Sequence, residues 1–137
     1  MNKLSYKKFC SQKNQNLLQF HVNQLKKALH IPDGSEVSSW RYIPDKHEEG
    51  TGVQIDLIFD RPDNLVNLCE IKYSTVSFKI DKKYAEHMLH REKIYRNVTK
   101  TNKQIFHSMI VSTALKKTMY SEEIIASVTT LADLFKP

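Results

Sequence analysis

Three residues near the middle of the sequence, Asp56, Glu70 and Lys72, have types and spacing suited to chemistry on a phosphodiester. Two carboxylates held close together repel each other, so such a pair calls for a compensating cation. A hard divalent cation such as Mg²⁺ or Mn²⁺ suits them, because it takes carboxylate oxygens and also accepts phosphate oxygens from a substrate. A nearby lysine can hold the phosphate and the attacking water. Together these residue types indicate metal-assisted phosphodiester hydrolysis.

Two neighbouring strands would bring the three side chains together. Apolar residues alternate over 53–59, which predicts a strand. One of its faces carries Val53, Ile55, Leu57 and Phe59, and the other carries Gln54, Asp56 and Ile58. After a turn at 61–64, a second strand over 65–73 places Glu70 and Lys72 on one face with Val66 and Leu68. If the turn centres on Asp63, facing residues have numbers that add to 126, so Asp56 stands opposite Glu70.

The same three residues also allow an ordinary interpretation. An exposed hairpin face often carries Asp, Glu and Lys as a surface ion pair, which contributes little to stability. Against this, Asp56 and Glu70 lie among apolar residues on strands with two apolar faces, which indicates burial on both sides. Buried charges of this kind usually belong to functional sites.

The remaining pattern predicts one α/β domain over residues 1–137, in which a central mixed sheet is flanked by helices. A first helix is expected within 6–30, ended by Pro32-Asp33-Gly34, and a second begins after the N-cap Asp81 and runs to about residue 98. Its apolar stripe comprises Tyr84, Met88, Leu89 and Tyr95. Further strands are expected over 36–43, 104–113 and 126–131, in the overall order helix, three strands, helix, strand and a short last strand.

Composition narrows the class of protein. The chain of 137 residues is 40% hydrophobic and 26% charged, with three glycines and four prolines, as in a compact globular domain. We expect a cytoplasmic protein without membrane contact, because no apolar run is long enough to span a bilayer. Cys10 and Cys69 lack the spacing of a zinc site, which predicts buried reduced thiols. The net charge of +6 favours partners that carry phosphate.

At the chemically suited residues the sequence resembles a known family. The segments 52–61 (GVQIDLIFDR) and 67–74 (NLCEIKYS) are similar to the PD-(D/E)xK nuclease-like domain at the C-terminus of a group of bacterial AAA-type ATPases. The segments 25–31, 36–40, 80–84 and 128–135 also resemble that domain, so the likeness covers nearly the whole chain. It implies a restriction-endonuclease-like fold and Mg²⁺-dependent cleavage of DNA.

The resemblance also implies roles for individual residues. Asp56 and Glu70 would bind the metal together with the backbone carbonyl of Ile71, and Lys72 would be the catalytic lysine. Members of the superfamily often place another acidic residue on the first helix, where this chain has Gln15. The chain also lacks the phosphate loop of an ATPase, so it is either a standalone relative or the C-terminal part of such a protein, with an ATPase domain as its partner in cis or in trans.

Several residues are candidates for supporting roles. Gln15, Gln54 and Ser74 are accessory candidates, and Lys82, Lys83, His87 and Arg91 on the second helix could follow a nucleic-acid backbone. A solvated helix face would look the same. Two functions therefore stay open: a metal-dependent endonuclease, which would need two sites and hence a homodimer to cut both strands, and a non-cleaving module that binds nucleic acid or an ATPase.

Overall fold

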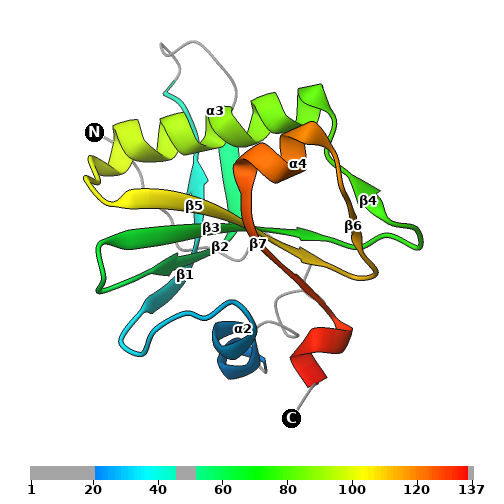
Figure 1. The fold of residues 1–137 in the computed structure, drawn as a ribbon. Coiled ribbons are helices and arrows are strands. Elements are labelled where there is room, and N and C mark those ends of the chain that lie inside the picture. Colours follow the sequence, from blue (N-terminus) through cyan, green and yellow to red (C-terminus); the bar gives the residue numbers. More distant parts are fainter. Residues whose placement is uncertain (1–20, 46–51, 136–137) are drawn as a thin grey trace.

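The computed structural model describes residues 21–45 and 52–135, and its centre is a five-stranded sheet with the strand order β1-β2-β3-β5-β7 (Figure 1). The strands are β1 Glu36–Tyr42, β2 Val53–Asp60, β3 Leu65–Lys72, β5 Gln104–Val111 and β7 Ile125–Thr130. The helices are α2 Val22–Ala28, α3 Lys82–Thr99 and α4 Met119–Ile124, followed by the 3₁₀ turn η1 Ala132–Phe135. This confirms the predicted mixed α/β architecture.

The direction of the strands follows from their connections. β1, β2 and β3 are antiparallel neighbours, with a short turn between β2 and β3, whereas β5 and β7 run parallel to β3. A parallel neighbour requires a crossover connection, and α3 supplies it between β3 and β5. The register of β2 against β3 is the predicted one, from Leu57 opposite Cys69 to Asp60 opposite Val66.

Helix α3 begins and ends where local chemistry permits. The Asp81 side chain caps it by accepting a hydrogen bond from the Tyr84 amide at 2.8 Å. At the other end Lys100 has a left-handed backbone, with φ of 58°, and its amide donates to the carbonyl of Arg96. Ala85, Met88 and Tyr95 face inward and are buried. Leu89, predicted for the same stripe, is 49% exposed, because it lies on the flank of the helix that the sheet does not cover.

Helices cover both faces of the sheet. In Figure 1, α3 and α4 lie on one side and α2 and η1 on the other. On the α2 side, Leu25, Leu29, Phe59, Cys69 and Leu134 belong to one buried cluster. On the α3 side, Tyr95 and Trp40 pack with residues of β2 and β3, and their rings meet edge to face at 5.2 Å between centroids.

Some elements were not predicted. The two-residue strands β4 Phe78–Lys79 and β6 Leu115–Lys116 pair as a separate small sheet, and they are too short to show a period. Helix α4 begins with a capping box in which Thr118 and Ser121 exchange side-chain to backbone hydrogen bonds. Of the helix expected within 6–30, only the part from Val22 onward falls within the described residues.

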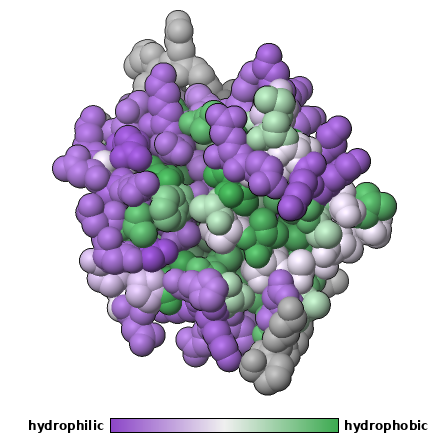
Figure 2. Space-filling view, in the orientation of Figure 1, coloured by the Kyte–Doolittle hydropathy of each residue, from purple (hydrophilic) through white to green (hydrophobic). Residues whose placement is uncertain are grey.

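The surface shows where apolar residues lie uncovered. Figure 2 shows hydrophobic side chains at the centre of one face, below α3, surrounded by hydrophilic ones. Within residues 21–45 and 52–135, no helix is long and apolar enough to cross a membrane.

Candidate active site at the end of strands β2 and β3

A β-bulge in β2 determines the position of Asp56. Ser38 pairs with Ile58 and Trp40 with Ile55, so β2 advances three residues where β1 advances two. The bulge reverses the alternation of side chains, because Ile55 and Ile58 pack on the α3 side whereas Leu57 packs on the α2 side. The strict alternation predicted for 53–59 is therefore wrong. The prediction failed because Leu57 and Ile58 are both apolar, so the sequence pattern does not show where the extra residue of the bulge lies.

At the bulge, the Asp56 side chain accepts a hydrogen bond that a backbone carbonyl of β2 would otherwise accept from β3. Its Oδ2 accepts a hydrogen bond from the Ile71 amide at 3.0 Å, at the place where a backbone carbonyl of β2 would otherwise stand. The N–H and C=O of one strand residue point toward the same edge, so the Ile71 carbonyl is also directed to the β2 side. Asp56 and this carbonyl, two of the three predicted metal-binding groups, thus lie at one opening between β2 and β3.

Glu70 lies on β3 with its side chain toward α3, and it is 7% exposed. Oε2 accepts a hydrogen bond from the Tyr84 hydroxyl at 2.9 Å, and Oε1 lies 2.7 Å from Nη1 of Arg91. Burial raises the pKa of the Glu70 carboxyl above its ordinary value, and the negative charge of Asp56 raises this pKa further. Arg91, Tyr84 and Lys72 act in the opposite direction. The Glu70 carboxylate is thus held in place by one hydroxyl and one guanidinium.

Lys72 lies two residues beyond Glu70 on the same face of β3. Its Nζ lies 5.1 Å from the centroid of the Tyr84 ring and 5.7 Å from that of Phe78. Aromatic faces attract an ammonium group, so the two rings hold Lys72 close to the carboxylates while leaving its N–H groups available for hydrogen bonding. The structure thus brings all three predicted residues, Asp56, Glu70 and Lys72, to the same end of β2 and β3.

Helix α3 contributes two residues that sequence reasoning did not assign to the site. Tyr84 was expected only as core, and Arg91 as part of an exposed basic face. Arg91 instead turns inward: its side chain is 24% exposed and its guanidinium carbon lies 5.9 Å from the centroid of the Tyr84 ring. The available signal was position, because residue 91 follows residue 84 by two helical turns and so shares its inward face.

The other nucleic-acid candidates remain at the surface. Lys82, Lys83 and His87 are exposed on the first turns of α3. His87 is three residues after Tyr84 and four before Arg91, so it adjoins both on the helix surface. His87 therefore borders the site, whereas Lys82 lies on the flank of α3 that faces α4.

The accessory candidates differ in their placement. Gln54 is half-buried on β2 just before the bulge, whereas Gln15 lies outside the described residues. Ser74 follows β3, where its amide donates to the Ser112 hydroxyl and its carbonyl accepts from the same hydroxyl, both at 2.7 Å. These bonds fix the chain directly after Lys72.

A second polar pair lies behind the site. Nε2 of His107 on β5 lies 2.8 Å from Oε1 of Glu92 on α3. Burial lowers the pKa of His107, while the hydrogen bond and charge of Glu92 raise it and the charge of Arg91 lowers it. His107 lines a cavity of about 10 Å³ together with Glu70 and Arg91. A cavity of this size holds about one water molecule.

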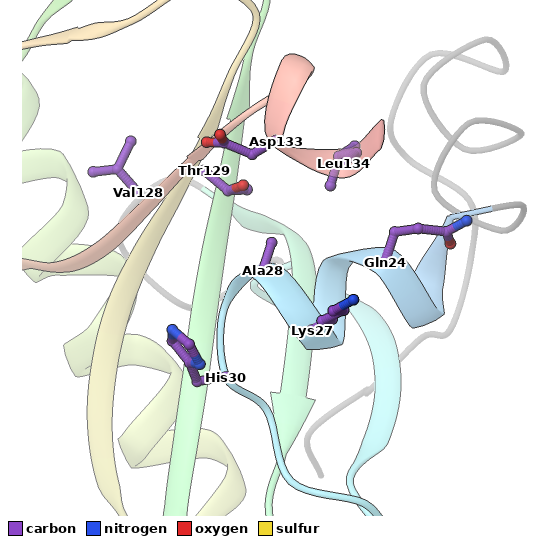
Figure 3. A pocket seen from close by; sticks show the side chains of 8 residues that line it. All are labelled: Gln24, Lys27, Ala28, His30, Val128, Thr129, Asp133 and Leu134. Atoms are coloured by element: carbon purple, nitrogen blue, oxygen red, sulfur yellow. The ribbon is translucent and has the colours of Figure 1, made fainter. Parts of the chain in front are cut away.

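A larger pocket lies on the opposite face, away from the carboxylates. It has a volume of about 270 Å³ between α2, β7 and η1, and Figure 3 shows Lys27, His30 and Asp133 around it. Its lining, within the described part of the chain, includes none of the predicted site residues.

The donor set of the site is small. Among the described residues, no group of three or more His, Cys, Asp or Glu side chains could hold a metal ion. A cation at this site would therefore be bound by two carboxylates, the Ile71 carbonyl and water.

Comparison with known proteins bears on the fold only. No family model matches the chain, and no curated protein matches it. Among solved structures the chain is similar to the "Crystal Structure of Protein of Unknown Function AF1548", with a TM-score of 0.50 and 17% sequence identity. The likeness covers 84% of this chain and 58% of that chain. The present chain thus spans a little more than half of the other protein, and the two have a similar arrangement of helices and strands.

Proposed function

We propose that the chain is an Mg²⁺- or Mn²⁺-dependent DNA endonuclease-like phosphodiester hydrolase with a restriction-endonuclease-like fold of the PD-(D/E)xK type. The observation that carries this proposal is the meeting of Asp56, Glu70 and Lys72 at one end of two adjacent strands, beside the β2 bulge. Glu70 is buried there, although burial of a carboxylate is unfavourable. A cost of this kind is typical of functional sites.

The residues present fit a hard divalent cation. Asp56, Glu70 and the Ile71 carbonyl would hold it, and all three offer oxygen, the donor that Mg²⁺ and Mn²⁺ prefer. Few protein donors suffice for Mg²⁺, which keeps several of its waters and also takes phosphate oxygens. When bound, the metal would lower the pKa of a water and polarise the scissile phosphate.

The chain's own residues would supply the rest of the chemistry. Lys72 would donate hydrogen bonds from Nζ to a phosphate oxygen and orient the attacking water, and the rings of Tyr84 and Phe78 would keep it there. The hydroxyl of Tyr84 would keep Glu70 oriented through Oε2. The Ile71 amide does the same for Asp56.

DNA as the substrate is supported by charge. The chain has a net charge of +6, and Lys82, Lys83 and His87 are exposed on the first turns of α3, the helix that also carries Tyr84 and Arg91, where they could contact backbone phosphates. Cutting both strands would require a homodimer. We further propose that the domain works in the cytoplasm with an AAA-type ATPase domain, in cis or in trans, as the sequence resemblance implies.

Cleavage of supercoiled plasmid tests the proposal. Nicking is expected with Mg²⁺ or Mn²⁺, and EDTA should stop it. Asp56→Asn and Lys72→Met should abolish nicking, whereas Glu86→Gln and Lys79→Met, which change exposed residues outside the site, should not. Circular dichroism would establish that all four variants fold. Full activity in both site variants would reject the mechanism.

One observation favours a second function, that of a non-cleaving module that binds nucleic acid or an ATPase partner. Both oxygens of Glu70 already have partners in Tyr84 and Arg91, so the charge is compensated without a metal. Such a protein would bind duplex DNA with an affinity that falls steeply with salt and would yield no product. Lys82→Ala with Lys83→Ala should then reduce both the affinity and its dependence on salt. No DNA binding at low salt would instead favour an ATPase partner.

A further inference from the structure

Arg91 occupies the place at Glu70 that a divalent cation would need. Its Nη1 lies 2.7 Å from Oε1 of Glu70. A metal bound to Oε1 at about 2.1 Å would stand within contact distance of this guanidinium. Two cations so close in a mostly buried site repel each other, so they would compete for Oε1.

The partner on the other oxygen does not conflict with a metal. Tyr84 is neutral and donates a single hydrogen bond to Oε2. A phenol hydroxyl has an ordinary pKa of about 10, so it keeps its proton at neutral pH. A donor on the second oxygen of a metal-binding carboxylate orients that carboxylate. Tyr84 can therefore stay in place when Arg91 leaves.

The contact between Arg91 and Glu70 is of a kind that a metal ion could replace. Within the described part of the chain, Nη1 is buried but has no aligned hydrogen-bond acceptor, so charge rather than a directed hydrogen bond holds it at Glu70. The side chain is still 24% exposed and is long enough to move its charge into solvent. It adjoins the exposed His87 on α3, so a path to the surface is short.

We propose that Arg91 is a resident counter-ion that closes the metal site, and that a divalent cation binds Glu70 only by displacing it. Tyr84 is a positioning residue that keeps Glu70 oriented in both states. This inference rests on the proposed function, because it takes Glu70 as a metal-binding residue. It explains how a chain with a buried carboxylate near a second one can fold before metal is bound: Arg91 compensates the charge of Glu70 until then.

Metal affinity measured directly tests the displacement. Mn²⁺ binding followed by the loss of its free-ion electron paramagnetic resonance signal should be about tenfold or more tighter in Arg91→Gln than in the wild type. A tenfold change corresponds to about 1.4 kcal/mol. Arg91→Lys, which keeps the positive charge, should stay nearer to the wild type, and Tyr84→Phe should bind Mn²⁺ more weakly. Equal or weaker binding by Arg91→Gln would overturn the proposal.

A measurement on the wild type covers the case in which Arg91→Gln does not fold. Titration with Mg²⁺, followed by NMR of the arginine Nε–H groups, should move the Arg91 resonance and increase its mobility, while Arg96 serves as the internal control. An unchanged Arg91 signal at saturating Mg²⁺ would show that the ion pair persists and would refute displacement.

The outcomes also separate this inference from the proposed function. If the wild type and Arg91→Gln bind Mn²⁺ equally and nick plasmid, the metal site stands and the closing role of Arg91 is wrong. If no variant binds Mn²⁺ and none nicks plasmid, both proposals are wrong.

Discussion

The hydroxyl of Tyr84 and the carboxylate of Glu70, which are 14 residues apart, meet at 2.9 Å between helix α3 and strand β3. This bond joins the crossover helix to the end of the strand on which Lys72 also lies. Two cations lie near the Tyr84 ring, with Lys72 Nζ 5.1 Å and the Arg91 guanidinium carbon 5.9 Å from its centroid. One aromatic residue therefore contacts three charged groups of the site.

Removal of the Tyr84 hydroxyl should destabilise the fold. In Tyr84→Phe the ring remains, but Oε2 of the buried Glu70 loses its donor, so we expect a loss of about 1 to 3 kcal/mol in the free energy of unfolding. Urea denaturation followed by circular dichroism measures it. The matched control is Tyr120→Phe on α4, whose hydroxyl makes no hydrogen bond within the described residues. Equal stability of both variants would show that the Tyr84 bond contributes nothing.

The bond from the Ile71 amide to Asp56 predicts a difference between two substitutions. Asp56→Asn keeps an oxygen that can accept the hydrogen bond, whereas Asp56→Ala leaves the Ile71 amide without this acceptor. We expect Asp56→Ala to lose about 1 kcal/mol of stability and Asp56→Asn to lose less. Amide hydrogen exchange at Ile71 should accelerate in Asp56→Ala but little in Asp56→Asn. Equal protection of the Ile71 amide from exchange in the two variants would show that the Asp56 side chain is not its hydrogen-bond acceptor.

The strand pair was predictable because its signals are local. A turn centred on Asp63 sets the pairing, and the observed partners Leu57 and Cys69 agree with it. The alternation of Val66, Leu68, Glu70 and Lys72 also placed the last two on one face correctly. Two strands that are separated by turn residues and have a side-chain period of two leave few alternative pairings.

The bulge and the inward turn of Arg91 were not predictable from the same signals. A strand that is apolar on both faces, such as β2, does not reveal where one residue is inserted, since Leu57 and Ile58 suit either face. For Arg91 the pattern of charge on α3 favoured a solvated face. Its spacing from Tyr84 indicated the inward face, but Glu70, the partner of its charge, lies on a different element and could not be read from α3.

Burial predicts the reactivity of Cys69. The thiol is buried, and burial raises its pKa, so almost none of it is ionised at neutral pH. In a Cys10→Ser background, native protein should react with a chromogenic disulfide reagent far more slowly than protein unfolded in urea. Cys10→Ser with Cys69→Ser gives the blank. Fast labelling of the native protein would show that Cys69 is accessible.

His107 makes the stability of the fold depend on pH. Burial lowers its pKa below the usual value of 6.5, and this exceeds the opposing effect of Glu92. As the pH falls below 6.5, the unfolded chain therefore takes up a proton at His107 that the folded chain resists. The stability that the neutral imidazole contributes is present above pH 6.5 and is lost as the pH falls through and below that value.

Replacement of His107 should remove this part of the acid sensitivity. We expect His107→Gln to lower the thermal midpoint at pH 8, because a buried ring is lost, but to flatten its decline between pH 7 and pH 5. The control is His90→Gln, which changes an exposed histidine on α3 and should leave the slope unchanged. Scanning calorimetry across this range measures both. The burial of His107 predicts that its proton is taken up by the unfolded chain first. If the thermal midpoint of His107→Gln declines below pH 7 as steeply as that of the wild type, a group other than His107 causes the decline.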